Sequence, residues 1–207
     1  MVKQRIIINI FKGSSFLAIL LMMAIYDQWH NPTAWVYLGL HGTYGILWVL
    51  KSQIFPDKNW EKDVGLLWAV LTAFGLIAYW LAPWLLLSRG IECPPWYLGM
   101  CVSMNIFGVF LHFVTDMQKF TSLNLQPNTL ITTGMMDRVR NLNYFGELLV
   151  YLSMGLLSMH WIPILILALF IFIYWLPNMR RKDESLSRYP GFKAYCKRTN
   201  WFIPFLY

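Results

Sequence analysis

Charged residues are scarce in this chain of 207 residues: they make up 13% of it, whereas 57% of the residues are hydrophobic. A globule of this length has too little interior to bury so much apolar surface, so a water-soluble domain is excluded. Acidic residues are the rarer charges, with ten Asp and Glu against seventeen Lys and Arg, and the formal net charge is +7. Such a chain needs lipid as its solvent, with its cations at the membrane surface.

Cysteines are also few, and the motifs of soluble enzymes are missing. Cys93, Cys101 and Cys196 show neither C-x-x-C nor metal-ligand spacing, so we expect no disulfide framework and no metal site. The sequence has no G-x-G-x-x-G after a strand, no P-loop, and no H-E-x-x-H or G-x-S-x-G motif, and nothing indicates nucleic-acid binding. A soluble nucleotide-binding fold is excluded, so any cofactor must lie among the helices.

Long hydrophobic runs are what the sequence does have. A helix that crosses about 30 Å of hydrocarbon needs about 20 mostly apolar residues. Near His160–Pro163 the last run is broken by a proline, which interrupts helical hydrogen bonding and predicts a hairpin of two helices. The fold class we expect is therefore all-α: a polytopic membrane protein of about six transmembrane helices, forming a single domain over residues 1–207. The runs are 16–26 (which 6–10 could extend), 33–55, 64–87, 96–114 and the double run 145–176.

The basic residues orient this topology, because Lys and Arg collect in cytoplasmic loops. Sixteen of the seventeen fall on one side, beginning with Lys3, Arg5 and Lys12, and only Arg89 falls on the other. Both termini, including a basic C-terminal tail, are therefore expected in the cytoplasm, at a membrane that the sequence does not identify. A signal peptide is the alternative for the first run, but no small-x-small cleavage site follows Tyr26.

Polar residues near the cytoplasmic helix ends are candidates for a binding site, since they are costly inside a bilayer. Asn143 and Glu147 share a helix face at i and i+4 and could hold an amide or a ribose hydroxyl; the alternative is an N-cap at Asn143 with Glu147 favoured by the helix dipole. His112 and Asp116 have the same spacing and precede Lys119. They form either a local ion pair or part of a ligand site.

An aromatic stripe lies in the middle of the second run, where His41, Tyr44 and Trp48 follow one another at i, i+3 and i+7. Such a stripe often serves packing alone. His41 and the Tyr44 hydroxyl need polar partners if they are buried, so a pair that donates a proton or binds a carbonyl group is the functional alternative.

Three blocks in the second half of the chain resemble a known family, the membrane reductases that include steroid 5-alpha-reductases, sterol C14 reductases and bacterial DUF1295 proteins. The resemblance covers residues 116–207, close to half the chain, and depends on the order and spacing of the blocks at cytoplasmic helix ends. The blocks are 115–120 (TDMQKF), the segment from Gly134 that ends in 140–147 (RNLNYFGE), and 183–195 (DESLSRYPGFKAY) with 198–199 (RT) and 202–204 (FIP).

The resemblance implies that residues 115–207 form a reductase-like region that binds NADPH. It implies hydride transfer to a carbon–carbon double bond of a lipophilic substrate, such as a steroid, sterol or enoyl-lipid, in lipid metabolism. The substrate would enter from the bilayer and be protonated after hydride transfer. Asn143 and Glu147 would face the nicotinamide amide, and His41, Tyr44 and Glu147 would be catalytic. The other cofactor-binding residues implied are Asp116, Lys119, Arg140, Tyr144, Glu184, Tyr195 and Arg198.

Two alternatives remain at this point. A membrane methyltransferase of the isoprenylcysteine or phospholipid type, dependent on S-adenosylmethionine, shares the architecture and an acidic pair such as Asp183 and Glu184. A non-catalytic subunit of a larger membrane complex is the other, because the family's R-H-P-N-Y motif is replaced by R-N-L-N-Y at residues 140–144. Eleven tryptophans would offer such a subunit large surfaces for lipids or partners.

Overall fold

The computed structural model describes residues 2–206, and of Val2, Lys58, Asn59, Leu71 and Phe74 it describes only the backbone. Tyr207, the last residue of the resemblance, lies outside this range. The expected all-helical class is confirmed. Among the described residues, the two strands are β1 (Val2–Lys3) and β2 (Asp63–Val64), which have two residues each and pair in antiparallel orientation. Within the described residues, four helical segments are long and apolar enough to cross a membrane: Gln4–Ile25, Leu66–Ser88, Pro95–Leu125 and Trp161–Leu186.

The chain divides into two compact units, which we call unit 1 and unit 2. Unit 1 runs up to Asn105 and also includes Leu152–Ile164. Unit 2 consists of Ile106–Tyr151 and the chain from Leu165 onward. Each unit is described separately below.

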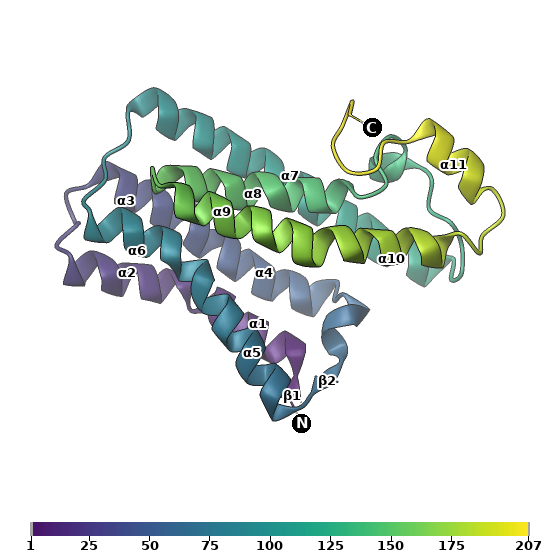
Figure 1. The fold of residues 1–207 in the computed structure, drawn as a ribbon, viewed down its shortest axis with the longest axis horizontal. Helices are drawn as coiled ribbons and strands as arrows, with labels where there is room; N and C mark the ends of the chain where they lie inside the picture. The colour runs from purple at the N-terminus through teal and green to yellow at the C-terminus, as the bar shows by residue number, and fades with distance from the viewer. Residues whose placement is uncertain (1, 207) are drawn as a thin grey trace. The chain divides into compact units, whose positions relative to one another are not determined.

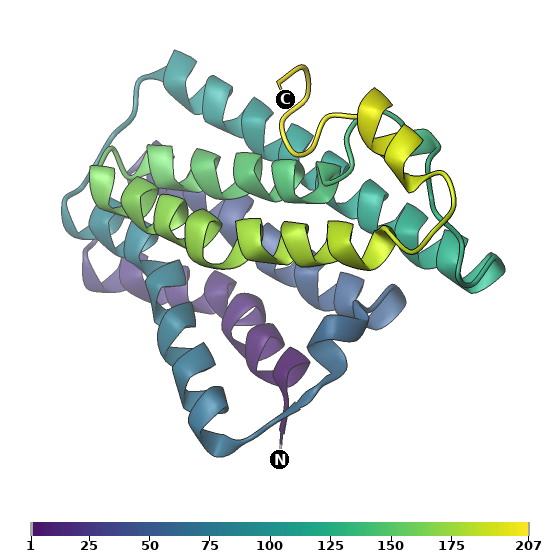
Figure 2. The same cartoon turned by 45° about the vertical axis from the view of Figure 1, so that its right-hand side comes forward.

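Unit 1 contains most of the N-terminal helices. α1 packs against α4 and α5, and α2 packs against η1 and α6. Figures 1 and 2 both show α5 beside α1 and close to the β1–β2 pair. The elements are α1 (Gln4–Gly13), α2 (Ser15–Ile25), α3 (Pro32–Tyr37), η1 (Leu38–Gly42), α4 (Thr43–Ile54), η2 (Lys58–Glu61), α5 (Leu66–Ile77), η3 (Ala78–Trp80) and α6 (Leu81–Ser88).

Of the run predicted at residues 33–55, all but Phe55 is helical, in one stretch from Pro32 to Ile54. Asn31 caps its start, because the Asn31 side chain accepts hydrogen bonds from the backbone of Thr33 at 2.9 Å and Ala34 at 3.2 Å, and proline suits the first helical position. The helix stops two residues before Pro56, which disfavours helical geometry in the residue preceding it. In between, η1 is a π-turn that contains His41.

Glycine brings α4 against the first helices of unit 1. A Cβ atom added to Gly45 would collide with the Lys12 carbonyl oxygen, and one added to Gly42 would lie 2.5 Å from the Phe16 ring. Small residues let membrane helices approach until their backbones touch. This contact places the Lys12 side chain against α4.

Unit 2 is built on α7 (Pro95–Leu125) beyond Asn105 and on α8 (Leu142–Leu157) up to Tyr151. A Cβ atom on Gly108 would lie 2.6 Å from the Gly146 carbonyl oxygen, and a Cβ atom on Gly146 would lie 2.5 Å from the backbone nitrogen of His112. The backbones of α7 and α8 therefore touch at this pair. The remaining elements are η4 (Gly134–Met136), α9 (Trp161–Phe170), whose first four residues belong to unit 1, η5 (Ile171–Trp175), α10 (Leu176–Leu186) and α11 (Phe192–Arg198).

The predicted break at His160–Pro163 corresponds to a turn between α8 and α9. α8 ends at Leu157, Met159 has a positive φ of 44°, and α9 begins at Trp161. Pro163 falls in the first turn of α9, where its missing N–H costs no hydrogen bond. Next to the turn, Ile164 and Pro163 lie against Gly155.

Two helices extend beyond the hydrophobic runs that predicted them. α7 continues to Leu125, beyond residue 114, and the last long helix continues through η5 and α10 to Leu186, beyond residue 176. Charged and polar side chains end a hydrophobic run without ending a helix. The π-turn of η5 ends two residues before Pro177, and such a wide turn accommodates a residue that lacks an N–H group.

Large apolar side chains cover the outer faces of these helices. Leu17 is 70% exposed, Leu66 82%, Phe107 65% and Phe172 66%. In water so much exposed apolar surface would be unfavourable, whereas in lipid it costs nothing. This exposure fits a chain surrounded by hydrocarbon.

Candidate functional site

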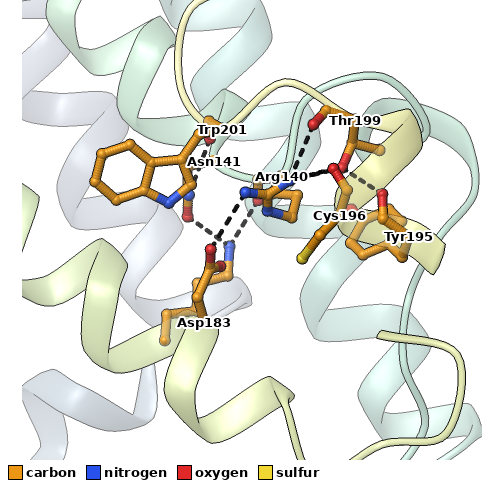
Figure 3. Close-up of polar contacts among 8 residues, drawn as sticks. Arg140, Asn141, Asp183, Tyr195, Cys196, Thr199 and Trp201 are labelled. Carbon is orange, nitrogen blue, oxygen red and sulfur yellow. Dashed lines mark hydrogen bonds and ion pairs between the residues drawn. The ribbon is translucent and has the colours of Figure 1, made fainter. Parts of the chain in front are cut away.

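Arg140 is the centre of a polar cluster in unit 2. Its Nη1 atom donates hydrogen bonds to the Thr199 carbonyl and hydroxyl oxygens, both at 2.9 Å, and to the Cys196 carbonyl oxygen at 3.2 Å. Its Nη2 atom lies 3.4 Å from Asp183 Oδ2. Figure 3 shows the guanidinium group between α10 and the C-terminal segment. Arg140 therefore fastens the loop before α8 to both.

Lys182 completes this cluster from α10. Its ammonium group donates to the Arg140 carbonyl oxygen at 2.8 Å and to Asn141 Oδ1 at 3.0 Å. The Asn141 side-chain amide donates in turn to the Trp201 carbonyl oxygen at 3.0 Å, so each member of the cluster joins the tail to the loop or to α10. We call Arg140, Asn141, Lys182, Asp183 and Thr199 the tail clamp.

An open hollow with about 560 Å³ of free space adjoins the tail clamp. Arg140 and Asp183 are among the residues that line it, and each has a buried atom, Arg140 Nε and Asp183 Oδ1, with no hydrogen-bond partner among the described residues. A buried donor and a buried acceptor without partners indicate room for a polar ligand or water. The residues that line the hollow are Arg140, Arg180, Asp183, Glu184 and Trp201.

Tyr195 and Arg198 attach α11 to the loop that precedes α8. The Tyr195 hydroxyl donates to the Met136 carbonyl oxygen at 2.7 Å, and burial raises the pKa of Tyr195 to about 12, so this hydroxyl stays a neutral donor. Arg198 donates to the Thr132 carbonyl oxygen at 2.9 Å and lies 3.8 Å from Asp137. Both side chains, predicted to hold a cofactor, bind protein groups here.

A second polar cluster lies where α7 and α8 touch. Asn143 donates to Asp116 Oδ1 at 3.1 Å, and His112 Nδ1 lies 3.0 Å from the Asn143 carbonyl oxygen. His112 is 2% exposed, and its Nε2 atom lies 3.8 Å from Asp116 Oδ2. Asn143 is not an N-cap, because α8 begins one residue before it, at Leu142. His112 and Asp116 thus form a shared cluster with Asn143 and not merely a local pair.

Glu147 and Tyr144 point to other partners. The Glu147 carboxylate accepts a hydrogen bond from the Tyr151 hydroxyl at 3.2 Å. The rings of Tyr144 and Tyr151 lie 5.6 and 6.3 Å from that of Trp175. Lys182 of the tail clamp is also close enough to Asp116 and Lys119 for their charges to act on its ammonium group. The predicted cofactor residues of unit 2 thus form one charged region with several centres.

His41 and Tyr44 belong to unit 1. The Nδ1 atom of His41 lies 3.0 Å from the Tyr37 hydroxyl, and its ring meets the Tyr79 ring edge-on at 4.2 Å. His41 is 1% exposed, and no described group bonds to its Nε2 atom. Trp48 is the third member of the stripe. The Lys12 ammonium group lies over its ring, 3.3 Å from the ring centroid.

Sequence reasoning missed several of these groups. Lys12 was placed with the loop cations, but it lies in α1 and is 4% exposed; a lysine inside an apolar helical segment was the available indication. Lys182 precedes the acidic pair that the sequence singled out, whereas Asn141 and Thr199 gave no indication. Within the described residues no group of three His, Cys, Asp or Glu side chains gathers as metal ligands would.

Comparison with curated proteins finds no match for the chain. Comparison with protein families does find one. The family described as "Protein of unknown function (DUF1295)" matches residues 57–199, which is well over half of the chain and contains every residue of the two polar clusters of unit 2. The chain therefore belongs to the DUF1295 family.

Proposed function

We propose that this protein is a membrane-embedded, NADPH-dependent reductase of a carbon–carbon double bond in a lipophilic substrate of the steroid, sterol or enoyl-lipid type. The observation that supports this proposal is the hollow beside the tail clamp, whose lining residues include Arg140 and Glu184, and two of whose lining residues each have a buried polar atom without a partner among the described residues. Unpaired polar atoms beside open space are what a polar cofactor would satisfy.

The residues present are suited to a dinucleotide phosphate. The Arg180 guanidinium is exposed at the hollow, and guanidinium groups bind phosphates through paired hydrogen bonds. Because both terminal nitrogens of Arg140 contact protein groups and its Nε atom is buried, that residue would position the loop. Trp201 offers an aromatic face for a base. NADPH would supply the hydride, and Asn143 and Glu147 are the candidates to orient its nicotinamide amide.

In this proposal the chain crosses the membrane six times. Pro32–Ile54 and the 16-residue Leu142–Leu157 would add two crossings to the four long apolar segments, with both termini in the cytoplasm. His41 and Tyr44 would then lie at membrane depth, where a donor to the substrate is needed.

Titration of the purified full-length protein with NADPH, followed by quenching of tryptophan fluorescence, tests the cofactor. We expect saturable quenching that Arg180→Ala, Lys119→Ala and Glu147→Ala each weaken about fivefold or more, as loss of a charged contact does. Lys193→Ala is the matched control, because it removes one exposed cation from α11. Equal quenching in all four variants would remove the proposed site. Tight binding of S-adenosylmethionine without NADPH binding would instead support a methyltransferase.

One observation favours a second candidate, a non-catalytic subunit of a membrane complex. Arg140, Tyr195 and Arg198 all bind protein carbonyl groups, which is how purely structural side chains behave. This alternative predicts that the protein purifies as a stoichiometric part of a complex whose function survives Glu147→Gln and Asn143→Ala.

A further inference from the structure

The chain after α11 forms a turn that exposes large apolar side chains. The Leu206 backbone nitrogen donates a hydrogen bond to the Ile203 carbonyl oxygen at 3.2 Å. The Asn200 side-chain amide donates to the Leu206 carbonyl oxygen at 2.9 Å, which holds the turn closed. Phe205 and Leu206 point away from the protein, and the Leu206 side chain is more than half exposed. We call residues 203–206 the tail tip.

The backbone of the tail tip is strained at Phe205, whose φ is 65°. This φ, with Pro204 before it, fits a type II turn, in which the third residue has a positive φ and is usually glycine. A bulky side chain in this conformation is rare and costs free energy. Packing within the protein does not offset the cost, because Phe205 is 96% exposed. A partner outside the protein that takes up an aromatic ring would offset it.

The tail tip follows a segment that lies against the beginning of α8. The Phe202 ring lies 6.4 Å from the ring of Phe145, in the first turn of α8. Asn141, directly before α8, donates to the Trp201 carbonyl oxygen at 3.0 Å. Figures 1 and 2 show the chain after α11 turning back toward this end of α8. In the proposed topology α8 enters the membrane here from the cytoplasm, so the tip lies at the level of the cytoplasmic headgroups.

Positive charge precedes the tail tip. The basic residues are Arg188, Lys193, Lys197 and Arg198, and no acidic residue follows Glu184 in the sequence. Lys193 and Lys197 are exposed at i and i+4, on one face of α11, and neither is paired with a carboxylate among the described residues. A basic segment at the membrane surface is attracted to anionic lipids. The charge of this segment therefore complements an anionic leaflet.

We propose that the tail tip inserts into the cytoplasmic leaflet, with Phe205 and Leu206 among the headgroups and the first acyl carbons. Lys193 and Lys197 then interact with anionic headgroups. One apolar contact with a bilayer is weak, whereas an apolar group together with a basic patch gives stable attachment. The proposal rests on the proposed orientation of the tail and not on NADPH binding, so the tip can prove to lie in water while NADPH still binds.

Spin labelling of the full-length protein in vesicles of phosphatidylcholine and phosphatidylglycerol tests the proposal. A nitroxide is attached at Leu206→Cys in a Cys196→Ser background, in which the remaining Cys93 and Cys101 are buried. Its collisions with oxygen and with a water-soluble nickel chelate are measured. We expect frequent collisions with oxygen and few with the chelate, as for a label in lipid. A label at Ser187→Cys, which is exposed beyond α10, should show the reverse.

Removing the aromatic ring should release the tip. Phe205→Ala should weaken insertion about tenfold or more, the effect of losing one buried aromatic side chain, so the chelate should reach the label at residue 206. Phe172→Ala is the matched control, because it removes an exposed ring from η5 in the same unit, and it should leave the label inaccessible to the chelate. In Phe205→Ala, replacing phosphatidylglycerol by phosphatidylcholine should raise the accessibility further, since the lysines of α11 then lose their anionic partners.

Three results would overturn the proposal. Frequent collisions with the chelate in the protein that retains Phe205 would place the tip in water. Exclusion of both oxygen and the chelate would indicate a protein partner, such as a second copy of the chain. Accessibility in Phe205→Ala that does not depend on phosphatidylglycerol would rule out an anionic leaflet as the occupant. The thermal unfolding midpoint checks the fold of each variant.

Discussion

At the scale of single residues, Lys182 connects α10 to the loop before α8, although the sequence did not single it out. Its ammonium group bonds to the backbone at Arg140 and to the side chain of Asn141 at once. Arg140 in turn donates a hydrogen bond to the Thr199 carbonyl oxygen, and Asn141 donates one to the Trp201 carbonyl oxygen. Removing this one cation takes a charged donor away from two acceptors, and it leaves the ion pair of Arg140 with Asp183 to connect the loop to α10.

We therefore expect Lys182→Met to destabilise the protein by about 1.5–3 kcal/mol, the worth of hydrogen bonds to a charged group. The measurement is the thermal unfolding midpoint in detergent. Lys193→Met, which removes an exposed lysine from α11, should change the midpoint little. An equal midpoint in both variants would show that the tail clamp does not depend on Lys182.

Cys196 gives a prediction about pH. Burial raises the pKa of its thiol, Arg140 opposes the shift and Asp183 adds to it, so less thiolate is present at a given pH than for an ordinary cysteine. The rate of maleimide labelling should therefore be low at pH 8 and still rise above pH 9.0, the ordinary value. Cys93 and Cys101 are buried, so Cys196→Ser should abolish the fast reaction. A plateau below pH 9 would contradict the raised pKa.

At the scale of helices, the approach of α7 to α8 depends on Gly108 and Gly146. Their contact brings His112 and Asp116 within reach of Asn143. The spacing of His112 and Asp116 followed from the helical period alone. Their contact with Asn143, about thirty residues later, follows from helix packing, which periodicity does not encode.

Gly108→Ala should destabilise the protein by about 1–3 kcal/mol, because the new methyl group meets a carbonyl oxygen that cannot move aside. Gly99→Ala is the matched control in the same helix. No atom lies within 4 Å of its Cβ position, and alanine favours helix over glycine by roughly 0.5–1 kcal/mol. Unfolding midpoints of the two variants should move in opposite directions, and a shared direction would contradict the close contact.

At the scale of the whole molecule, orientation in the membrane is the property that most needs a test. In our proposal the C-terminal tail is cytoplasmic, so a maleimide that cannot cross membranes should label Cys196 in inside-out vesicles and not in right-side-out vesicles. Right-side-out vesicles opened with detergent show that the thiol is reactive, and Cys196→Ser shows that the label is specific. Labelling of sealed right-side-out vesicles would reverse the topology.

Sequence by itself determined the chemical class of this protein, because composition and run length decide which solvent a helix requires. It identified the helical runs, the break before Pro163 and the polar residues at helix ends, since all of these depend on neighbours in the chain. Tertiary structure alone decided the partners of those residues: Arg140 with Thr199, Asn143 with Asp116, and Lys12 with Trp48. These contacts depend on how closely helices approach, which a few glycines and buried charges settle in three dimensions.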